Sequence, residues 1–231
     1  MHHALITGAN RGLGLEHARQ LLERGWHVSA AVRNPDAATE LAALAEGEGK
    51  LDIHAYDAAD PASAAALAAV VTGPVDLLFA NAGMASSETR AFGQAAGAAM
   101  LDEFRVNTIA PLALVEAFAG QVEASEMKVI ALQSSRMGSV RENESGGAYG
   151  YRSSKAALNA IGKSLSIDLK DRGIVVLILH PGWVKTDMGG PHGQLTVQES
   201  VSGQLDLIAR AYGNPVMSGR FYHVSGQDLP W

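Results

Sequence analysis

The feature that most constrains the fold of this chain is a regular alternation of short apolar runs with segments of helical periodicity. The first run, residues 4–7, precedes a segment in which Leu15, Ala18 and Leu22 fall on one helical face. Comparable runs recur at residues 27–32, 51–56, 76–80, 128–133, 174–180 and 220–223. Strands joined through helices pair in parallel. The pattern therefore predicts an α/β fold, a doubly wound parallel sheet of about seven strands with helices on both faces.

Length and hydrophobic content predict one domain. A chain of 231 residues with 47% hydrophobic residues can bury one sizeable core, and no linker interrupts it, so we expect residues 1–231 to form a single domain. No apolar run is long enough to span a membrane, and the first residues lack the basic flank and cleavage site of a signal peptide. We therefore expect a cytoplasmic protein with no membrane partner.

Charge and residue usage exclude several functions. The net charge of −6 comes from scattered residues, which argues against a nucleic-acid partner. The absence of cysteine excludes disulfides and thiolate catalysis. His180 and His192 have no companions at ligand spacing, so we predict structural roles for both and no catalytic metal.

A glycine-rich turn follows the first apolar run. Three glycines allow the backbone to turn sharply and approach a pyrophosphate at a helix N-terminus, so the turn indicates a dinucleotide site. A strand-to-helix turn without a ligand is the alternative. The residues that we expect to bind the cofactor here are Gly8, Asn10, Arg11, Gly12, Leu13 and Gly14.

Tyr151 and Lys155 lie four residues apart, which places both on one face of a helix. A nearby cation favours the phenolate, so this pair can bring a tyrosine toward the pH range useful for proton transfer. A solvated face of an amphipathic helix is the alternative. Tyr149 lies six residues from Lys155, about 600° around a helix, and is expected to face away from the ammonium.

Further motifs occur in an order that resembles one family. They are Asn81-Ala82-Gly83, Asn107, Ser135, Tyr151-x-x-x-Lys155 and Pro181-Gly182, downstream of Gly-x-x-x-Gly-x-Gly. Together they resemble the short-chain dehydrogenase/reductase family across essentially the whole chain. The stretches 151–159 and 181–190 and the Pro230-Trp231 ending resemble its C-factor-like and Sniffer-type carbonyl reductase branch. The resemblance implies one Rossmann-type dinucleotide-binding oxidoreductase domain.

The resemblance also implies roles in carbonyl reduction, where one donor polarises the substrate oxygen and another protonates it. Tyr151 is the expected proton donor and Ser135 the expected polarising group, with Ser134 as a rival. Lys155 is expected to hold the nicotinamide ribose and to lower the Tyr151 pKa. Asn107 is expected to support a water relay to Lys155, the alternative being a local backbone partner.

The charges after the second and third runs bear on cofactor choice. NAD-binding proteins of this fold hold the ribose 2′-hydroxyl with an acid after the second strand, whereas this chain has Arg33 there. Arg33 suits a phosphate, and Arg11 stands where similar NADP-preferring proteins carry a cation, so we expect NADP(H) rather than NAD(H). Asp57 is expected to contact the adenine, with helix capping as the alternative.

The remaining cofactor contacts follow from the resemblance. Asn81, Ala82 and Gly83 are expected beneath the cofactor, where Asn81 supports the backbone or serves as a simple turn residue. The residues expected to line the nicotinamide pocket are Pro181, Gly182, Val184 and Thr186. We expect residues 188–194 to form a lid, with Thr196 and Glu199 as a capping box that starts the next helix.

The expected partner is a small-molecule carbonyl or alcohol substrate. Met84, Ala85, Met137 and Trp183 are expected pocket walls, and their apolar or small side chains favour a hydrophobic ketone, aldehyde or quinone. The resemblance implies a homodimer or homotetramer. A nucleotide-sensing or signalling protein without turnover is the alternative function, motivated by the C-factor resemblance.

Overall fold

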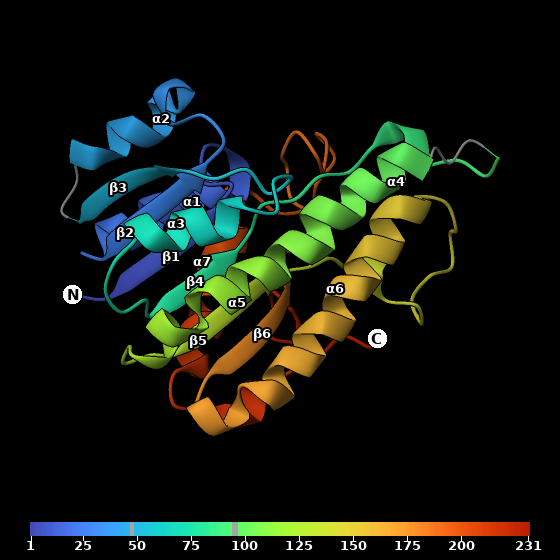
Figure 1. The fold of residues 1–231 in the computed structure, drawn as a ribbon. Coiled ribbons are helices and arrows are strands. Elements are labelled where there is room, and N and C mark those ends of the chain that lie inside the picture. The colour runs from blue at the N-terminus through green and yellow to red at the C-terminus, as the bar shows by residue number, and fades with distance from the viewer. Residues whose placement is uncertain (47–48, 94–96) are drawn as a thin grey trace.

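The computed structural model of the chain describes residues 1–46, 49–93 and 97–231, and its described strands form one parallel sheet (Figure 1). The strands are β1 (His3–Thr7), β2 (His27–Val32), β3 (Lys50–Ala55), β4 (Leu77–Ala80), β5 (Val129–Gln133), β6 (Val175–His180) and β7 (Arg220–His223). Their order across the sheet is β3-β2-β1-β4-β5-β6-β7. The predicted doubly wound sheet is confirmed, and each strand boundary agrees with the apolar runs to within one residue.

The central strands are apolar along their whole length because helices cover both faces of the sheet. Every residue of β4, β5 and β6 is buried. Leu77 and Val129 pair in register and contribute to one core, whereas their neighbours Leu78 and Ile130 contribute to the core on the opposite face. Strands buried on both faces read as continuous rather than alternating hydrophobic runs.

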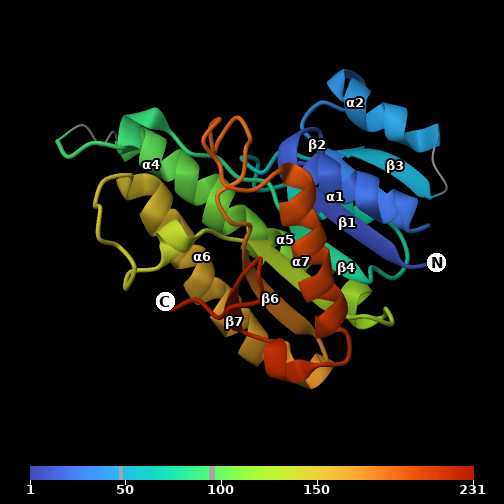
Figure 2. The ribbon, with the colours of Figure 1, turned by 180° about the vertical axis from the view of Figure 1, so that it is seen from behind.

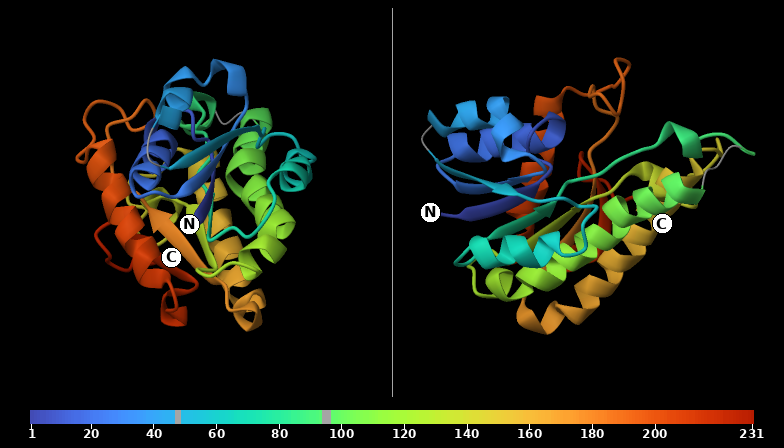
Figure 3. Two further views of the ribbon diagram at one scale, coloured as in Figure 1. Left: turned by 90° about the vertical axis from the view of Figure 1, so that its left-hand side faces the viewer. Right: turned by 45° about the horizontal axis from the view of Figure 1, so that its top comes forward.

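Two helical layers enclose the sheet (Figure 3). The helices are α1 (Gly12–Glu23), α2 (Thr39–Ala42), α3 (Ser63–Val70), α4 (Gly97–Phe104), α5 (Ala110–Glu123), α6 (Tyr149–Asp168) and α7 (Val197–Ala211). Figure 1 shows α3, α5 and α6 on one face, and Figure 2 shows α1 and α7 on the other. Short 3₁₀ helices span Pro35–Ala37, Ala43–Glu46, Ser87–Thr89, Arg136–Gly138, Lys170–Arg172 and Pro215–Met217.

The order of the strands reverses between β1 and β4. The chain first builds outward through β2 and β3, then returns to add β4 on the other side of β1. In parallel sheets such a switch point leaves a crevice at the carboxyl ends of the strands, where ligands bind. The glycine-rich turn after β1 and the Asn81-Ala82-Gly83 segment after β4 both lie at this switch point.

A π-helical turn, Arg105–Ile109, joins α4 to α5. Pro111 lies in the first turn of α5 and has no N–H group to donate to the carbonyl of Asn107, four residues earlier. The helix widens at this point, and such π-turns often occur at functional sites. The widened turn contains Asn107, which the sequence singles out.

No helix within the described ranges combines the length and the apolar character needed to cross a membrane.

Candidate active site

The turn between β1 and α1 depends on glycine conformations. Gly8 and Gly12 have φ of +68° and +54°, a left-handed region that residues with side chains disfavour. A Cβ atom on Gly14 would overlap the carbonyl oxygen of Gly8. Only glycine therefore allows α1 to begin this close to the end of β1.

The first turn of α1 has backbone N–H groups without a side-chain cap. Arg11 occupies the N-cap and makes no side-chain capping bond, and no acidic residue lies in the first turn. Asn10 and Arg11 are exposed here, and Leu13 packs partly against the core. Uncapped N–H groups and the positive end of the helix dipole attract an anion. The turn fits the pyrophosphate of a dinucleotide.

Thr7 and Asn81 join the glycine turn to β4. The Thr7 Oγ1 accepts hydrogen bonds from the backbone N–H groups of Asn81 and Ala82, each at 3.1 Å. The Asn81 side chain donates to the Thr7 carbonyl at 2.9 Å. Asn81 thus acts on the backbone of another strand, in line with the expected support role. Thr7 was not predicted to be a site residue, although its position directly before Gly8 could have indicated a role at the glycine turn.

The residues expected to determine the cofactor preference lie at the exposed carboxyl edge of the sheet. Arg33 follows β2 directly and is exposed, as is Asp57 after β3. The Asp57 Oδ1 accepts the N–H of Ala59 at 2.9 Å within a turn, and α3 begins only at Ser63, so this contact is not a helix cap. Arg11 pairs with Asp187 at 3.2 Å, but both side chains are mostly exposed, so this ion pair contributes little stability.

The loop after β6 returns to the glycine turn. Gly182 has a φ of +81°, and Val184 is buried and bridges to Leu195. The Thr186 Oγ1 accepts the Gly189 N–H at 3.0 Å. A Cβ on Gly12 would lie 3.8 Å from the Thr186 methyl group. The fold therefore brings Thr186 beside the glycine turn, whereas its expected place in the nicotinamide pocket stays a prediction.

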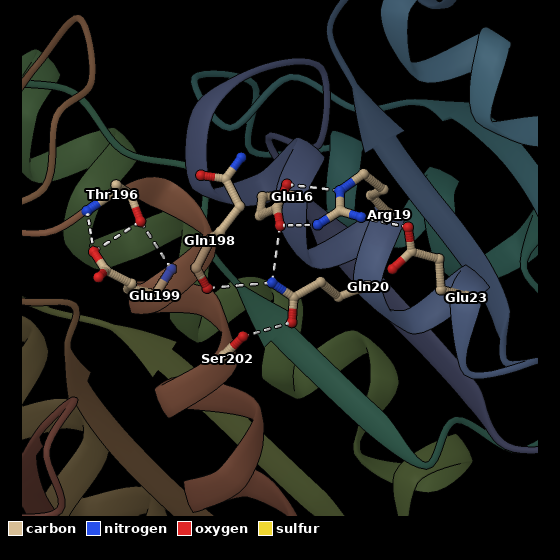
Figure 4. A network of polar contacts seen from close by, with 8 residues as sticks. All are labelled: Glu16, Arg19, Gln20, Glu23, Thr196, Gln198, Glu199 and Ser202. Carbon is tan, nitrogen blue, oxygen red and sulfur yellow. Dashed lines mark hydrogen bonds and ion pairs between the residues drawn. The ribbon is translucent and has the colours of Figure 1, made fainter.

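A polar network between α1 and α7 holds the far end of this loop (Figure 4). Gln20 donates to the carbonyl of Gln198 at 3.2 Å, and Ser202 donates to the Gln20 Oε1 at 3.1 Å. Thr196 and Glu199 form the predicted capping box at the start of α7. A short bond from Ser200 to the Pro181 carbonyl, at 2.7 Å, ties α7 to the beginning of the loop.

Asn107 is fully buried and connects three segments. Its Oδ1 accepts the N–H of Met84 at 2.9 Å, and its Nδ2 donates to the Met84 carbonyl at 2.8 Å and to the Ser154 Oγ at 3.1 Å. These partners lie far away in sequence, so the alternative of a local backbone partner does not apply. A Cβ on Gly83 would lie 3.2 Å from Asn107 Oδ1 and 3.5 Å from Lys155 Nζ, so this glycine lets the two polar groups approach.

Tyr151 and Lys155 share one face of α6. The Lys155 Nζ lies 5.9 Å from the centroid of the Tyr151 ring and donates to the Gln133 carbonyl at 2.8 Å. Lys155 is 4% exposed, and burial lowers its pKa to about 8 because the charged ammonium is poorly solvated. Tyr149 is exposed at the start of the helix.

The two serines after β5 have different surroundings. The Ser134 hydroxyl donates to the Asn159 Oδ1 at 2.5 Å and is buried. The Ser135 Oγ accepts the Met137 N–H at 3.2 Å, and this hydroxyl lies close enough to the Tyr151 phenol to lower its pKa. A Cβ on Gly138 would lie 2.8 Å from the Lys155 backbone, so this turn packs tightly on α6. Of the two rivals, Ser135 is the one that meets Tyr151.

Burial raises the pKa of Tyr151, because the phenolate loses solvation. The nearby Ser135 hydroxyl lowers this pKa, and the negative charge of Glu103 raises it further. The direction is opposite to the one expected from the Tyr151–Lys155 pair, since burial outweighs the other contributions. The phenol is therefore fully protonated at neutral pH.

The residues expected to form the substrate walls differ in their exposure. Met84, Ala85 and Met137 are partly buried, whereas Trp183 is 50% exposed. The Trp183 Nε1 donates to the Gly189 carbonyl at 2.7 Å, which fixes the indole on the loop after β6. The walls come from three separate loops at the carboxyl edge.

His180 and His192 do not form a metal site. His180 is buried, and burial lowers its pKa to about 3, which keeps the ring neutral. Across residues 1–46, 49–93 and 97–231, no three histidine or carboxylate side chains gather closely enough to hold a metal ion.

Comparison with known proteins agrees with the motifs. The family model described as short chain dehydrogenase matches residues 2–194. C-signal of Myxococcus xanthus is 44% identical over 162 residues, which cover 70% of this chain and 96% of that protein.

Two solved structures match the fold along the whole chain. The crystal structure of NADPH-bound carbonyl reductase from chicken fatty liver is 35% identical, has a TM-score of 0.90, and covers 100% of this chain and 99% of its own. The carbonyl reductase Sniffer of D. melanogaster is 34% identical, has a TM-score of 0.91, and covers 100% of both chains. The resemblance to the C-factor-like and Sniffer-type branch is confirmed. The chain belongs to the short-chain dehydrogenase/reductase family of oxidoreductases.

Proposed function

We propose that the protein is an NADPH-dependent carbonyl reductase in which Tyr151 donates the proton. The observation that carries this proposal is the meeting of Ser135, Tyr151 and Lys155 beside Asn107, next to the glycine turn. Tyr151 and Lys155 lie one helical turn apart, whereas Ser135 and Asn107 come from segments distant in sequence. A protein that only bound nucleotide would have no need of a partly buried acid, a polarising hydroxyl and a buried lysine in one corner.

The reduction assigns each group a defined task. When bound, NADPH would supply a hydride to the carbonyl carbon, and the carbonyl electron pair would move onto the oxygen. The Ser135 hydroxyl donates a hydrogen bond to that oxygen, and the Tyr151 hydroxyl transfers its proton to it, giving the alcohol. Solvent then returns a proton to the Tyr151 phenolate. The raised pKa of Tyr151 suits this direction, because the acid carries its proton at neutral pH.

Lys155 and Asn107 support this acid. Lys155 is expected to hold the nicotinamide ribose and to stabilise the phenolate as it forms, since its ammonium lies on the same helix face. Asn107 links the loop after β4 to α6 through Met84 and Ser154. We propose that Asn107 supports a water relay that ends at Lys155.

The preference for NADPH over NADH rests on charge. Arg33 is exposed directly after β2, where a carboxylate would bind the 2′-hydroxyl of NAD. A guanidinium can bind a 2′-phosphate with two hydrogen bonds. The chicken carbonyl reductase is described with NADPH bound, which supports the same choice for this chain.

The proposed substrate class follows from the side chains expected to line the substrate pocket. Met84, Ala85, Met137 and Trp183 present apolar or small surfaces, and Met188 on the same loop as Trp183 is 50% exposed. We propose a hydrophobic ketone, aldehyde or quinone.

The decisive experiment follows NADPH oxidation at neutral pH with a panel of such carbonyls. Tyr151→Phe should lower kcat about a thousandfold, because it removes only the transferable proton. Tyr149→Phe is the matched control, an exposed tyrosine two residues earlier, and should retain native turnover. NADPH binding, followed by fluorescence, should be retained in both variants. Native turnover that survives in Tyr151→Phe would show that another group is the acid.

A nucleotide-sensing or signalling protein is the second candidate. The observation that favours it is the 44% identity with C-signal. This function predicts that the native protein binds NADPH but oxidises it with no member of the carbonyl panel, and that Tyr151→Phe binds equally well.

A further inference from the structure

Glu103 is a fully buried carboxylate beside the reaction corner. It lies on α4, one helical turn before Asn107, and is 0% exposed. Its Oε1 accepts the Ser86 N–H at 2.8 Å, whereas its Oε2 has no hydrogen-bond partner among the described residues. A buried carboxylate with an unsatisfied oxygen destabilises a fold. Its presence therefore calls for a role beyond packing.

Glu103 and Asn107 together hold the segment after β4. Glu103 binds the backbone of Ser86, and Asn107 binds both backbone groups of Met84. Two side chains one turn apart on a helix thus bind alternate residues of an extended segment. That segment includes Met84 and Ala85, the proposed substrate walls.

The other side of Glu103 packs on the first turn of α6. A Cβ on Gly150 would overlap the Glu103 Oε2, so glycine at this position admits the carboxylate. Gly150 directly precedes Tyr151. Glu103 therefore fills the space between the substrate wall and the turn that carries the acid.

Glu103 lies beside the N-terminal turn of α6. The first turn of α6 contains no acidic residue, and Ala148 at its N-cap gives no side-chain bond, so Glu103 supplies a negative charge near the positive end of the helix. Glu103 from α4 and Lys155 from α6 face the Tyr151 side chain, together with the Ser135 hydroxyl from the turn after β5.

We propose that Glu103 is a positioning residue for the reaction, which holds the Met84–Ser86 wall and the first turn of α6 at a fixed separation and directs a negative charge at the Tyr151 phenol. The inference rests on the proposed role of Tyr151 as the acid. It adds a group that controls where and at what pH this acid works.

The first test measures the titration of Tyr151 itself. The difference in tyrosinate absorbance between each protein and its Tyr151→Phe counterpart isolates this phenol. Glu103→Gln retains the acceptor for Ser86 but removes the charge, so the Tyr151 titration midpoint should fall by about one pH unit. Asp102→Asn is the matched control, since it removes a charge from the exposed neighbouring residue and should leave the midpoint within about 0.2 unit of the native one.

The second test uses the melting temperature to measure how closely the Glu103 carboxylate packs against Gly150. Gly150→Ala should lower Tm in the native background, because the new methyl group overlaps the Glu103 carboxylate. In the Glu103→Ala background the same change should lower Tm much less, since only the Thr89 methyl group, 3.0 Å from the new Cβ, then remains close.

Two results would overturn the inference: a Glu103→Gln midpoint equal to the native one, or an equal effect of Gly150→Ala in both backgrounds. Neither readout needs turnover, so both decide the inference even if the protein reduces no carbonyl in the panel. Where turnover occurs, Glu103→Gln should also shift the alkaline limb of kcat to lower pH, and Asp102→Asn should not. Suppose that Tyr151→Phe loses turnover while Glu103→Gln leaves the alkaline limb of the kcat profile at its native pH. That result would support the proposed function and reject only the inference about Glu103.

Discussion

The glycine turn and the reaction corner lie at the same edge of the sheet but are built in different ways. The turn from Gly8 to Gly14 is shaped by backbone conformation and by the absence of side chains. The reaction corner is shaped by side chains from the π-turn, the end of β5 and α6, each of which bonds to a segment distant in sequence. The expected pyrophosphate site therefore depends on a contiguous stretch, whereas the proposed chemistry depends on tertiary packing.

Because the two regions are built differently, substitutions in them are expected to have different effects. A methyl group added to the glycine turn should disturb the backbone and weaken cofactor binding and stability together. Removal of one oxygen in the reaction corner should remove one function and leave the rest of the fold in place. The following variants test that contrast.

The largest effect is expected from the serine pair. Ser135→Ala should lower kcat about a hundredfold or more, because it removes the donor to the substrate oxygen, with little change in Tm. Ser134→Ala should instead lower the stability of the protein. It leaves the buried Asn159 Oδ1 unpaired and should cost about 1–3 kcal/mol of unfolding free energy while kcat stays near native. Steady-state kinetics and denaturant unfolding of both variants would check this, and the opposite assignment of the two losses would make Ser134 the polarising group.

A smaller effect is expected at the turn. Gly14→Ala places a methyl group against the Gly8 carbonyl and should cost about 2 kcal/mol of stability and weaken NADPH binding about tenfold. Gly120→Ala is the control, because Gly120 is exposed on α5 and its Cβ would meet no atom within 4 Å. That change should stabilise the helix by up to about 1 kcal/mol. Equal melting temperatures for the two variants would contradict the close approach of α1 to β1.

The smallest effect is expected from Arg33. Arg33→Ala should weaken NADPH binding about tenfold and leave NADH binding nearly unchanged, since only NADPH carries the 2′-phosphate. Titrations of both cofactors measure this ratio. A parallel loss for both would mean that Arg33 does not contact the phosphate.

The sequence predicted the central strands closely because they are buried on both faces. Such strands are continuous apolar runs whose ends are marked by the loss of apolar residues, so β4, β5 and β6 agree with the runs to within one residue. The capping box at Thr196 and Glu199 was predicted for a similar reason, since its two members are only three residues apart.

Long-range polar contacts were harder to predict. Thr7 reads as one more β-branched strand residue, and only the fold shows that its hydroxyl binds the backbone after β4. Glu103 reads as a solvent-facing residue of an amphipathic helix, because its partner Ser86 lies 17 positions away. The direction of the Tyr151 pKa was also wrong in the sequence-based expectation, since burial cannot be read from helical spacing.

The sequence by itself determined the parallel sheet, the glycine turn at its switch point and the pairing of Tyr151 with Lys155, because each follows from local periodicity, backbone sterics or one helical turn. Only the tertiary structure decided which serine meets the phenol, how Asn107 reaches Met84, and that Glu103 is enclosed beside Gly150. The physical reason is that hydrogen bonding and desolvation depend on distances between segments that the chain order leaves open.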